Sequence, residues 1–314
     1  MMRSGFVQIA VMSGVVLAAP VFADVVRVDL RAPAGGNGAS WATAYQSLSV
    51  AVAAAAGSGG RITEIRMGPG VHVPATEIVA LPAVLAIRGG FAGFGAADPD
   101  ARDLTAYPTV ISADRNGNDG AGFANYSDNW PGLLRANAAA WLTLDGLTLR
   151  GARVTALVLP AGGVLTVQDS ALLANQGQVV SAAGMPVVLR GTRISQCAGN
   201  NPLVAGSYDV QGGVIEDLTG TAFLFSNDGP KSLRLVGTTV RRVGSFASLS
   251  GASVSVEGCQ LETAGRSNIS TTGAIVFSGT RVQGPGGAGR GKGGCPRRTG
   301  AAVLRFQRVT RGRL

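Results

Sequence analysis

The segment Leu142-Thr-Leu144-Asp-Gly146-Leu-Thr-Leu149 decides the fold, because its pattern returns six more times along the chain. The pattern is apolar, any, apolar, any, small, any, any, apolar. The later copies start at positions 165, 187, 208, 233, 254 and 275, so the steps are 23, 22, 21, 25, 21 and 21 residues. A period of this size indicates stacked supersecondary units that share one core.

Each copy has the pattern of a strand, a bend and a second strand. Its first two apolar positions flank a mostly polar one, as in a strand with one buried face. The fifth position is Gly in six copies and Asp169 in the seventh, which predicts a bend where the backbone needs a positive φ. One period therefore holds about three short strands and three corners, and equivalent strands pair in parallel about 4.8 Å apart.

Other repeat architectures fit this sequence less well. The spacing of a leucine-rich repeat is absent, and a sandwich would show hairpin turns every 8–12 residues. A helical repeat would need a 3.6-residue rhythm, which the 47 glycines of this chain interrupt. The sequence predicts an all-β solenoid, and the stack Leu144, Val167, Leu189, Val210, Leu235, Val256 and Phe277 forms its predicted inner row.

The N-terminal half carries a family resemblance. It contains Ala34-Gly-Gly-Asn-Gly-Ala-Ser-Trp41, then Arg88-Gly-Gly-Phe-Ala-Gly-Phe94, then Pro108-Thr-Val-Ile-Ser-Ala-Asp114. In this order residues 24–283 resemble bacterial secreted pectate-lyase-like right-handed parallel β-helix proteins, including polymorphic-outer-membrane-protein-like surface proteins. The resemblance implies a right-handed coil, an N-terminal capping helix and export, and it implies no particular activity.

Three features of the N-terminal half follow from its own residues. Ser47 to Ala56 is Ala-rich and predicts the short helix over the open first coil. The pairs Ile65/Met67 and Leu85/Ile87 predict early strands 20 residues apart. The least periodic stretch, 98–132, predicts a loop or a partly inserted excursion.

Composition divides the chain into three parts. Residues 1–23 combine Arg3, an apolar stretch and a small-residue end, which predicts a signal peptide and a secreted or cell-surface protein. Residues 24–283 hold 18 basic and 18 acidic side chains, and form the predicted β-helix domain. Residues 284–314 carry eight positive charges and no acid, so the net charge of +9 arises mainly from this Gly-rich tail, which we predict to be disordered. A single edge strand around Phe306 is the alternative.

The sequence offers no catalytic group with a recognisable partner. His72 is the only histidine, and no pair of carboxylates stands at adjacent repeat positions on the outer face. Cys197 and Cys259 lie three repeats apart, beyond the reach of a disulfide. We therefore predict no catalytic residues, a monomer, no nucleic-acid partner and no transmembrane span in the mature chain.

Two candidate binding regions remain. Outward-facing repeat positions place six polar side chains on one flank, as a predicted ligand-binding face: Asp145, Gln168, Arg190, Asp209, Gln211 and Arg234. Asp209 and Arg234 are adjacent there and predict an exposed ion pair. Separately, four side chains alternate as in a calcium loop: Asp114, Asn116, Asn118 and Asp119. A solvated Asx-rich turn explains that second segment as well.

Two functions are consistent with these features. The first is an exported, non-catalytic β-helix of the cell surface or matrix that binds a polysaccharide or a cell-surface protein along its flank. The alternative is a polysaccharide lyase or glycoside hydrolase. The latter rests on fold analogy, and one fold hosts many functions.

Overall fold

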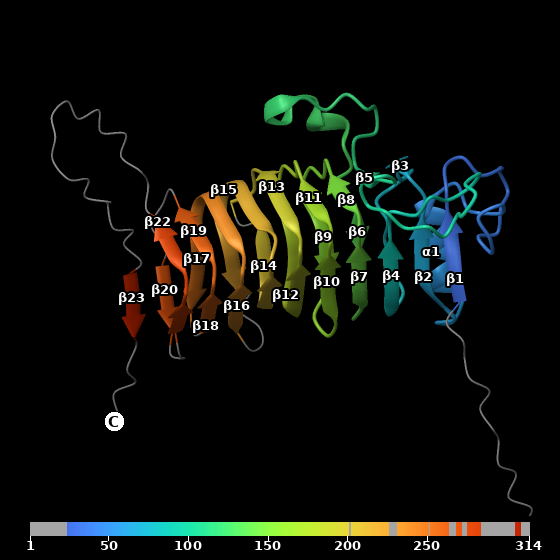
Figure 1. Ribbon diagram of the computed structural model, residues 1–314. Coiled ribbons are helices and arrows are strands. Elements are labelled where there is room, and N and C mark those ends of the chain that lie inside the picture. Colours follow the sequence, from blue (N-terminus) through green and yellow to red (C-terminus); the bar gives the residue numbers. More distant parts are fainter. Residues whose placement is uncertain are drawn as a thin grey trace, which may run out of the picture.

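The chain forms a parallel β-solenoid with one short helix at its N-terminal end, which confirms the predicted fold class (Figure 1). The computed structural model describes residues 24–200, 202–225, 231–250, 252–263, 268–271, 275–283 and 305–308. Among these residues no helix has the length and apolar character that crossing a membrane would require. The predicted signal peptide, 1–23, lies outside the described residues.

The first sheet contains the first strand of each of the seven repeat copies that begin at Leu142. Its strands pair in parallel from one coil to the next. In order they are β1 (Asp24–Val28), β2 (Ile62–Met67), β4 (Val84–Arg88), β7 (Trp141–Asp145), β10 (Val164–Gln168), the end of β12 (Gln178–Arg190), the end of β14 (Leu203–Gln211), β16 (Ser232–Val236), β18 (Ser253–Glu257) and β21 (Ile275–Ser278).

Two further parallel sheets complete each coil. The second contains β3 (Gly70–His72), β5 (Thr109–Ser112), β8 (Thr148–Arg150), β11 (Ala171–Leu173), β13 (Arg193–Cys197), the starts of β15 (Val214–Phe225) and β17 (Thr239–Ser250), β19 (Gln260–Thr263) and β22 (Arg281–Gln283). The third contains β6 (Leu134–Arg135), β9 (Thr155–Leu159), the starts of β12 and β14, the ends of β15 and β17, β20 (Asn268–Thr271) and β23 (Arg305–Arg308).

The predicted register of the seven repeat copies is confirmed at every step. Leu189, for example, pairs in parallel with Val167 on one side and Val210 on the other. The bend position holds a positive φ in all seven copies, from 47° at Asp169 to 67° at Gly146. Because six of these residues are Gly, the backbone enters the left-handed region there at little steric cost.

The register of the earliest coils differs from the prediction by two residues. Ile65 pairs with Ile87, 22 positions later, and not with Leu85. Leu85 and Ile87 in turn pair with Leu142 and Leu144, so more than fifty residues separate these two neighbouring strands. The intervening chain contributes β5 and β6 to the other sheets and two excursions outside them.

The N-terminal end of the solenoid is covered by its own chain. The helix α1 (Leu48–Gly57) buries Leu48, Ala51, Val52 and Ala55 against β1 and β2, as predicted. The segment 38–45 runs along the outer edge of β1, where Tyr45 donates to the Arg27 carbonyl and accepts from the Asp29 amide. The edge of β1 is thereby satisfied, which blocks strand addition at this end.

The core is a slender column of aliphatic side chains. The predicted inner row from Leu144 to Val256 is buried, and Phe277 is half-buried against it. Tyr208, Phe223 and Phe246 form an aromatic chain in the C-terminal half, with ring centroids 5.1 and 5.8 Å apart. Cys197 and Cys259 are buried and unpaired with each other, as predicted, whereas Cys295 lies outside the described residues.

One excursion leaves the solenoid between β5 and β6. Residues 113–131 rise above the coils and contain two short 3₁₀ helices, η1 (Ala121–Phe123) and η2 (Tyr126–Asp128) (Figure 1). The sequence placed an excursion in 98–132, but Thr109–Ser112 within that stretch is a regular strand, β5, between β3 and β8. This strand has only four residues and its two apolar side chains, Val110 and Ile111, are adjacent, so it shows no alternation that could reveal it.

The final described strand, β23, pairs in parallel with β20. It corresponds to the edge strand that the sequence offered as an alternative for the region of Phe306. The remainder of the tail predicted to be disordered, residues 284–304 and 309–314, lies outside the described residues.

Candidate functional site

The outer face of the first sheet brings the six predicted flank residues onto neighbouring coils. Asp145, Gln168, Arg190 and Gln211 are successive Cα partners on β7, β10, β12 and β14. In a second row Asp209 and Arg234 are partners on β14 and β16. Equivalent positions therefore repeat at the strand spacing, about 4.8 Å.

The C-terminal part of this face is open and polar. The predicted ion pair between Arg234 and Asp209 is confirmed, with Nη1 and Oδ1 2.9 Å apart. Gln211 donates from Nε2 to the other oxygen of Asp209, at 3.0 Å. Arg190 is exposed and Gln168 half-buried, so amide, carboxylate and guanidinium groups all face solvent here.

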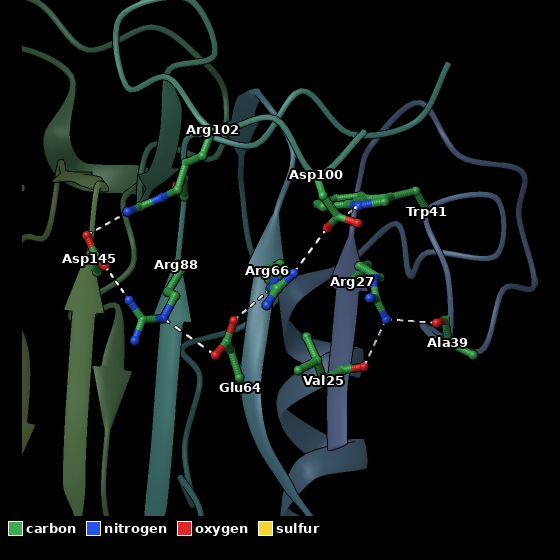
Figure 2. Close-up of polar contacts among 11 residues, drawn as sticks. Val25, Arg27, Ala39, Trp41, Glu64, Arg66, Arg88, Asp100, Arg102 and Asp145 are labelled. Atoms are coloured by element: carbon green, nitrogen blue, oxygen red, sulfur yellow. Dashed lines mark hydrogen bonds and ion pairs between the residues drawn. The ribbon is translucent and has the colours of Figure 1, made fainter. Parts of the chain in front are cut away.

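Asp145 has a different environment from the other five residues. Its side chain is 1% exposed, and Arg88 and Arg102 each hold one carboxylate oxygen at 2.6 Å (Figure 2). Arg102 comes from the loop that follows β4 and also donates to the Gly89 carbonyl. The ion pair between Asp145 and Arg102 therefore holds that loop against the sheet, and the carboxylate of Asp145 is not presented to solvent.

Asp145 belongs to a larger cluster on the first coils. Arg27, Arg66 and Arg88 are Cα partners on β1, β2 and β4, a stack of like charges that would repel without compensation. Glu64 bridges Arg66 and Arg88, with N–O separations of 2.7 and 3.5 Å. Asp100 accepts from Arg66 at 3.1 Å. Four guanidinium groups, including that of Arg102, therefore face three carboxylates, which leaves one positive charge in excess (Figure 2).

Aromatic rings lie against these cations. Phe91 has the guanidinium carbon of Arg66 5.3 Å and that of Arg102 5.6 Å from its centroid. Trp41 lies 5.8 Å from Phe91 and donates from Nε1 to Asp100 at 3.0 Å. Arg27 instead donates to the Val25 and Ala39 carbonyls, and it forms no ion pair with another described residue.

Trp141 is a residue of this face that the sequence analysis missed. It stands one position before the first repeat copy, and its side chain is exposed with a relative accessibility of 51%. Because it is two residues before Thr143 and four before Asp145 on the same strand, it shares their outward side. Its Cα partners are Val84, which is also exposed, and Val164. The sequence could have revealed Trp141, because residues two positions apart on a strand point to the same side of the sheet.

Comparison with known protein families, with curated proteins and with solved structures finds no match to this chain. The resemblance to pectate-lyase-like proteins therefore stands on the N-terminal sequence pattern and the solenoid alone.

The candidate calcium segment forms a turn closed by its own backbone. Asp114 accepts the amides of Gly117 and Asn118 on Oδ1, at 2.7 and 3.2 Å, and that of Asp119 on Oδ2, at 3.2 Å. Asn129 donates to both oxygens of Asp119, at 3.0 and 2.9 Å. These are the contacts of an Asx-rich turn. In the described part of the chain no group of three or more His, Cys, Asp or Glu is arranged to hold a metal, and calcium binding stays a prediction.

A third polar cluster lies on the outer face of the second sheet. Glu216, 2% exposed, accepts from Arg193, Arg241 and Arg242 at 2.9, 2.7 and 2.7 Å. Burial raises the pKa of Glu216, but the three guanidinium groups outweigh that effect and hold the pKa below its ordinary value.

This cluster predicts a specific pH dependence. A carboxyl group whose folded-state pKa is lowered stabilises the fold above its unfolded pKa, and that stabilisation is lost as pH falls through the folded pKa. We expect Glu216→Gln to lower the free energy of unfolding by about 1–2 kcal/mol at pH 6, since the arginines are about half-exposed. The difference from wild type should shrink below pH 4, as denaturant titrations at both pH values would show. A pH-independent difference would contradict the ionic role of Glu216.

Proposed function

We propose that this chain is an exported, non-catalytic β-helix protein of the cell surface or matrix that binds an extended glycan along the flank of its first sheet. The observation that carries the proposal is the exposed indole of Trp141 on the outer face of β7, the sheet face that also bears Gln168, Arg190 and Gln211 on the following coils. Apolar residues singly exposed are common on protein surfaces, but a large exposed aromatic on the same sheet face as an ordered polar row has the composition of a recognition surface.

The flank supplies both kinds of contact that a sugar chain needs. A pyranose ring has an apolar C–H face, which packs on an indole, and a rim of hydroxyl groups. Gln168, Arg190 and Gln211 stand at equivalent positions on three successive coils. Their spacing of about 4.8 Å is close to the length of one hexose unit, so successive sugars can meet successive coils.

The charge distribution favours an acidic glycan over a neutral one at this face. The cluster on the first coils has one guanidinium in excess, and Arg66, Arg88 and Arg102 are each about one-third exposed. Farther along, Arg190 is exposed as well. An excess of positive potential raises the local concentration of an anionic ligand, and this contribution weakens with added salt.

The test is a glycan array with the secreted chain, followed by titration of each hit. We expect Trp141→Ala to weaken binding by about tenfold or more, the loss of one well-packed aromatic contact. Val154→Ala is the matched control, because Val154 is 54% exposed and lies outside the flank. Equal affinity of wild type and Trp141→Ala for every hit would contradict the proposal.

The same preparation separates the alternative functions. A polysaccharide lyase or glycoside hydrolase would release unsaturated or reducing products from the bound glycan, and the proposed protein releases neither. A protein partner would be indicated if Trp141→Ala abolished binding to cells while the purified glycans bound neither variant. Export rests on the sequence of residues 1–23, and N-terminal sequencing of secreted protein should find Asp24 first.

A further inference from the structure

A cavity lies between the excursion, residues 113–131, and the corner that follows the second sheet. Its volume is about 270 Å³. The excursion contributes Gly120, Ala121, Gly122, Phe123 and Tyr126, and the corner contributes Ala174, Gln196, Cys197, Asp217 and Thr219. We propose that this cavity binds a single neutral, hydroxylated ring such as one terminal sugar residue. The proposal does not rest on the flank of the first sheet.

The excursion is held in place at its base. Tyr126 donates from its hydroxyl to the Ala174 carbonyl at 2.8 Å, and Asn129 donates to the Gly151 carbonyl at 2.7 Å. Trp130 donates from Nε1 to the Pro74 carbonyl at 2.9 Å, and Arg115 stacks 4.5 Å from its ring centroid. The cavity is therefore bounded by a fastened segment, which is the preorganisation that ligand sites need.

The two walls differ in chemistry. On the excursion side, the rings of Phe123 and Tyr126 meet edge to face with centroids 5.1 Å apart, and glycines leave room around them. On the corner side stand the amide of Gln196, the carboxylate of Asp217 and the hydroxyl of Thr219. Gln196 is exposed, so its side-chain amide is open to solvent and to a ligand in the cavity. One wall thus suits an apolar ring face and the other suits hydroxyl groups.

The backbone of the site is held in an unfavourable conformation. Phe123 has φ 65°, in the left-handed region that a bulky side chain rarely adopts. Ala174, Gln196 and Asp217 have φ between 50° and 59°, because they form the same sharp corner on successive coils. Phe123 is not part of that corner, so the repeat does not explain its strain. Strained residues concentrate at binding sites, where the surrounding structure fixes a side chain in position.

The size and charge of the cavity limit the class of ligand that it can bind. A volume of about 270 Å³ is just below the usual range for ligand pockets, so the cavity suits one ring and not an oligomer. Asp217 is the only lining residue with a formal charge. Arg242 donates to both of its carboxylate oxygens, at 2.6 and 2.9 Å, and so neutralises that charge. With that charge neutralised, the cavity favours neither an anion nor a cation, and it suits a neutral polyol.

The experiment uses the full chain and a panel of methyl glycosides. We expect saturation-transfer NMR to detect at least one neutral glycoside, with a Kd in the millimolar range that is ordinary for a single small ring. Backbone shifts of residues 120–126, 196 and 217 should report the site. Phe123→Asn should weaken binding by about tenfold, and it is compatible with folding because Asn adopts a left-handed φ more readily than Phe.

Controls make the outcome decisive. Gln196→Asn, which also tolerates the left-handed corner, should weaken the same glycoside, whereas Trp141→Ala and Val154→Ala should leave its affinity unchanged. Loss of binding in Trp141→Ala alone would move the glycoside to the flank and overturn this proposal without harming the proposed function. The proposal is also overturned if no neutral glycoside binds, or if methyl glucuronide or glucosamine binds in preference.

Discussion

Leu189→Asp is expected to unravel the central coils of the solenoid. Leu189 is 1% exposed, and it lies between Val167 and Val210 in the inner row. Losing a buried Leu side chain costs about 2–5 kcal/mol, and an unpaired buried carboxylate adds several kcal/mol more. Because each coil contacts mainly its neighbours, the damage should begin locally and spread from there.

Hydrogen exchange read by mass spectrometry would locate the effect. Protection should be lost first in β10, β12 and β14, while β1 and β2 stay protected at low denaturant. Thr166→Asp is the matched control, because Thr166 lies in the neighbouring strand β10 on the outer face and its Cα partners, Thr143 and Val188, carry no charge. It should cost less than about 1 kcal/mol. Similar losses in the two variants would contradict the assignment of the two faces.

The fold could be predicted because every copy of the repeat carries the same local signals. Alternating apolar residues mark the inward face, and the small residue at Gly146 and its equivalents marks the bend. The register of the first coils was wrong for a physical reason. A slip of two residues leaves the same side chains inward, so the pattern cannot distinguish Ile65 opposite Leu85 from Ile65 opposite Ile87. The register is decided by the loop that joins the two strands, and a loop has no periodic pattern from which its length could be predicted.

The candidate sites were less predictable, because they depend on residues far apart in sequence. The rows on the flank follow from the repeat, and so does the pair of Asp209 and Arg234. Arg102 contacts Asp145 from a loop 43 positions away, and no pattern in the sequence around either residue predicts the contact. The cavity beside Phe123 likewise forms where a non-repeating excursion returns to the coils.

Asp145→Asn is the second substitution from which we expect a large effect. The carboxylate is buried and is held by Arg88 and Arg102, which are each about one-third exposed. Breaking a buried ion pair by removing one partner costs about 3–5 kcal/mol. Solvent reaches both arginines, so we expect a loss near the lower limit, about 3 kcal/mol, together with release of the loop that follows β4.

Asp209→Asn is the matched control for that substitution, since Asp209 also pairs with an arginine on the first sheet. Its side chain is 35% exposed and that of Arg234 is 51% exposed, so the expected loss is less than about 1 kcal/mol. Added salt should reduce the effect of Asp209→Asn and leave that of Asp145→Asn nearly unchanged, because buried pairs are weakly screened. Denaturant titrations of both variants at low and high salt would measure this. Equal, salt-sensitive losses would mean that Asp145 is a surface charge, and its carboxylate would then be open to a ligand on the flank.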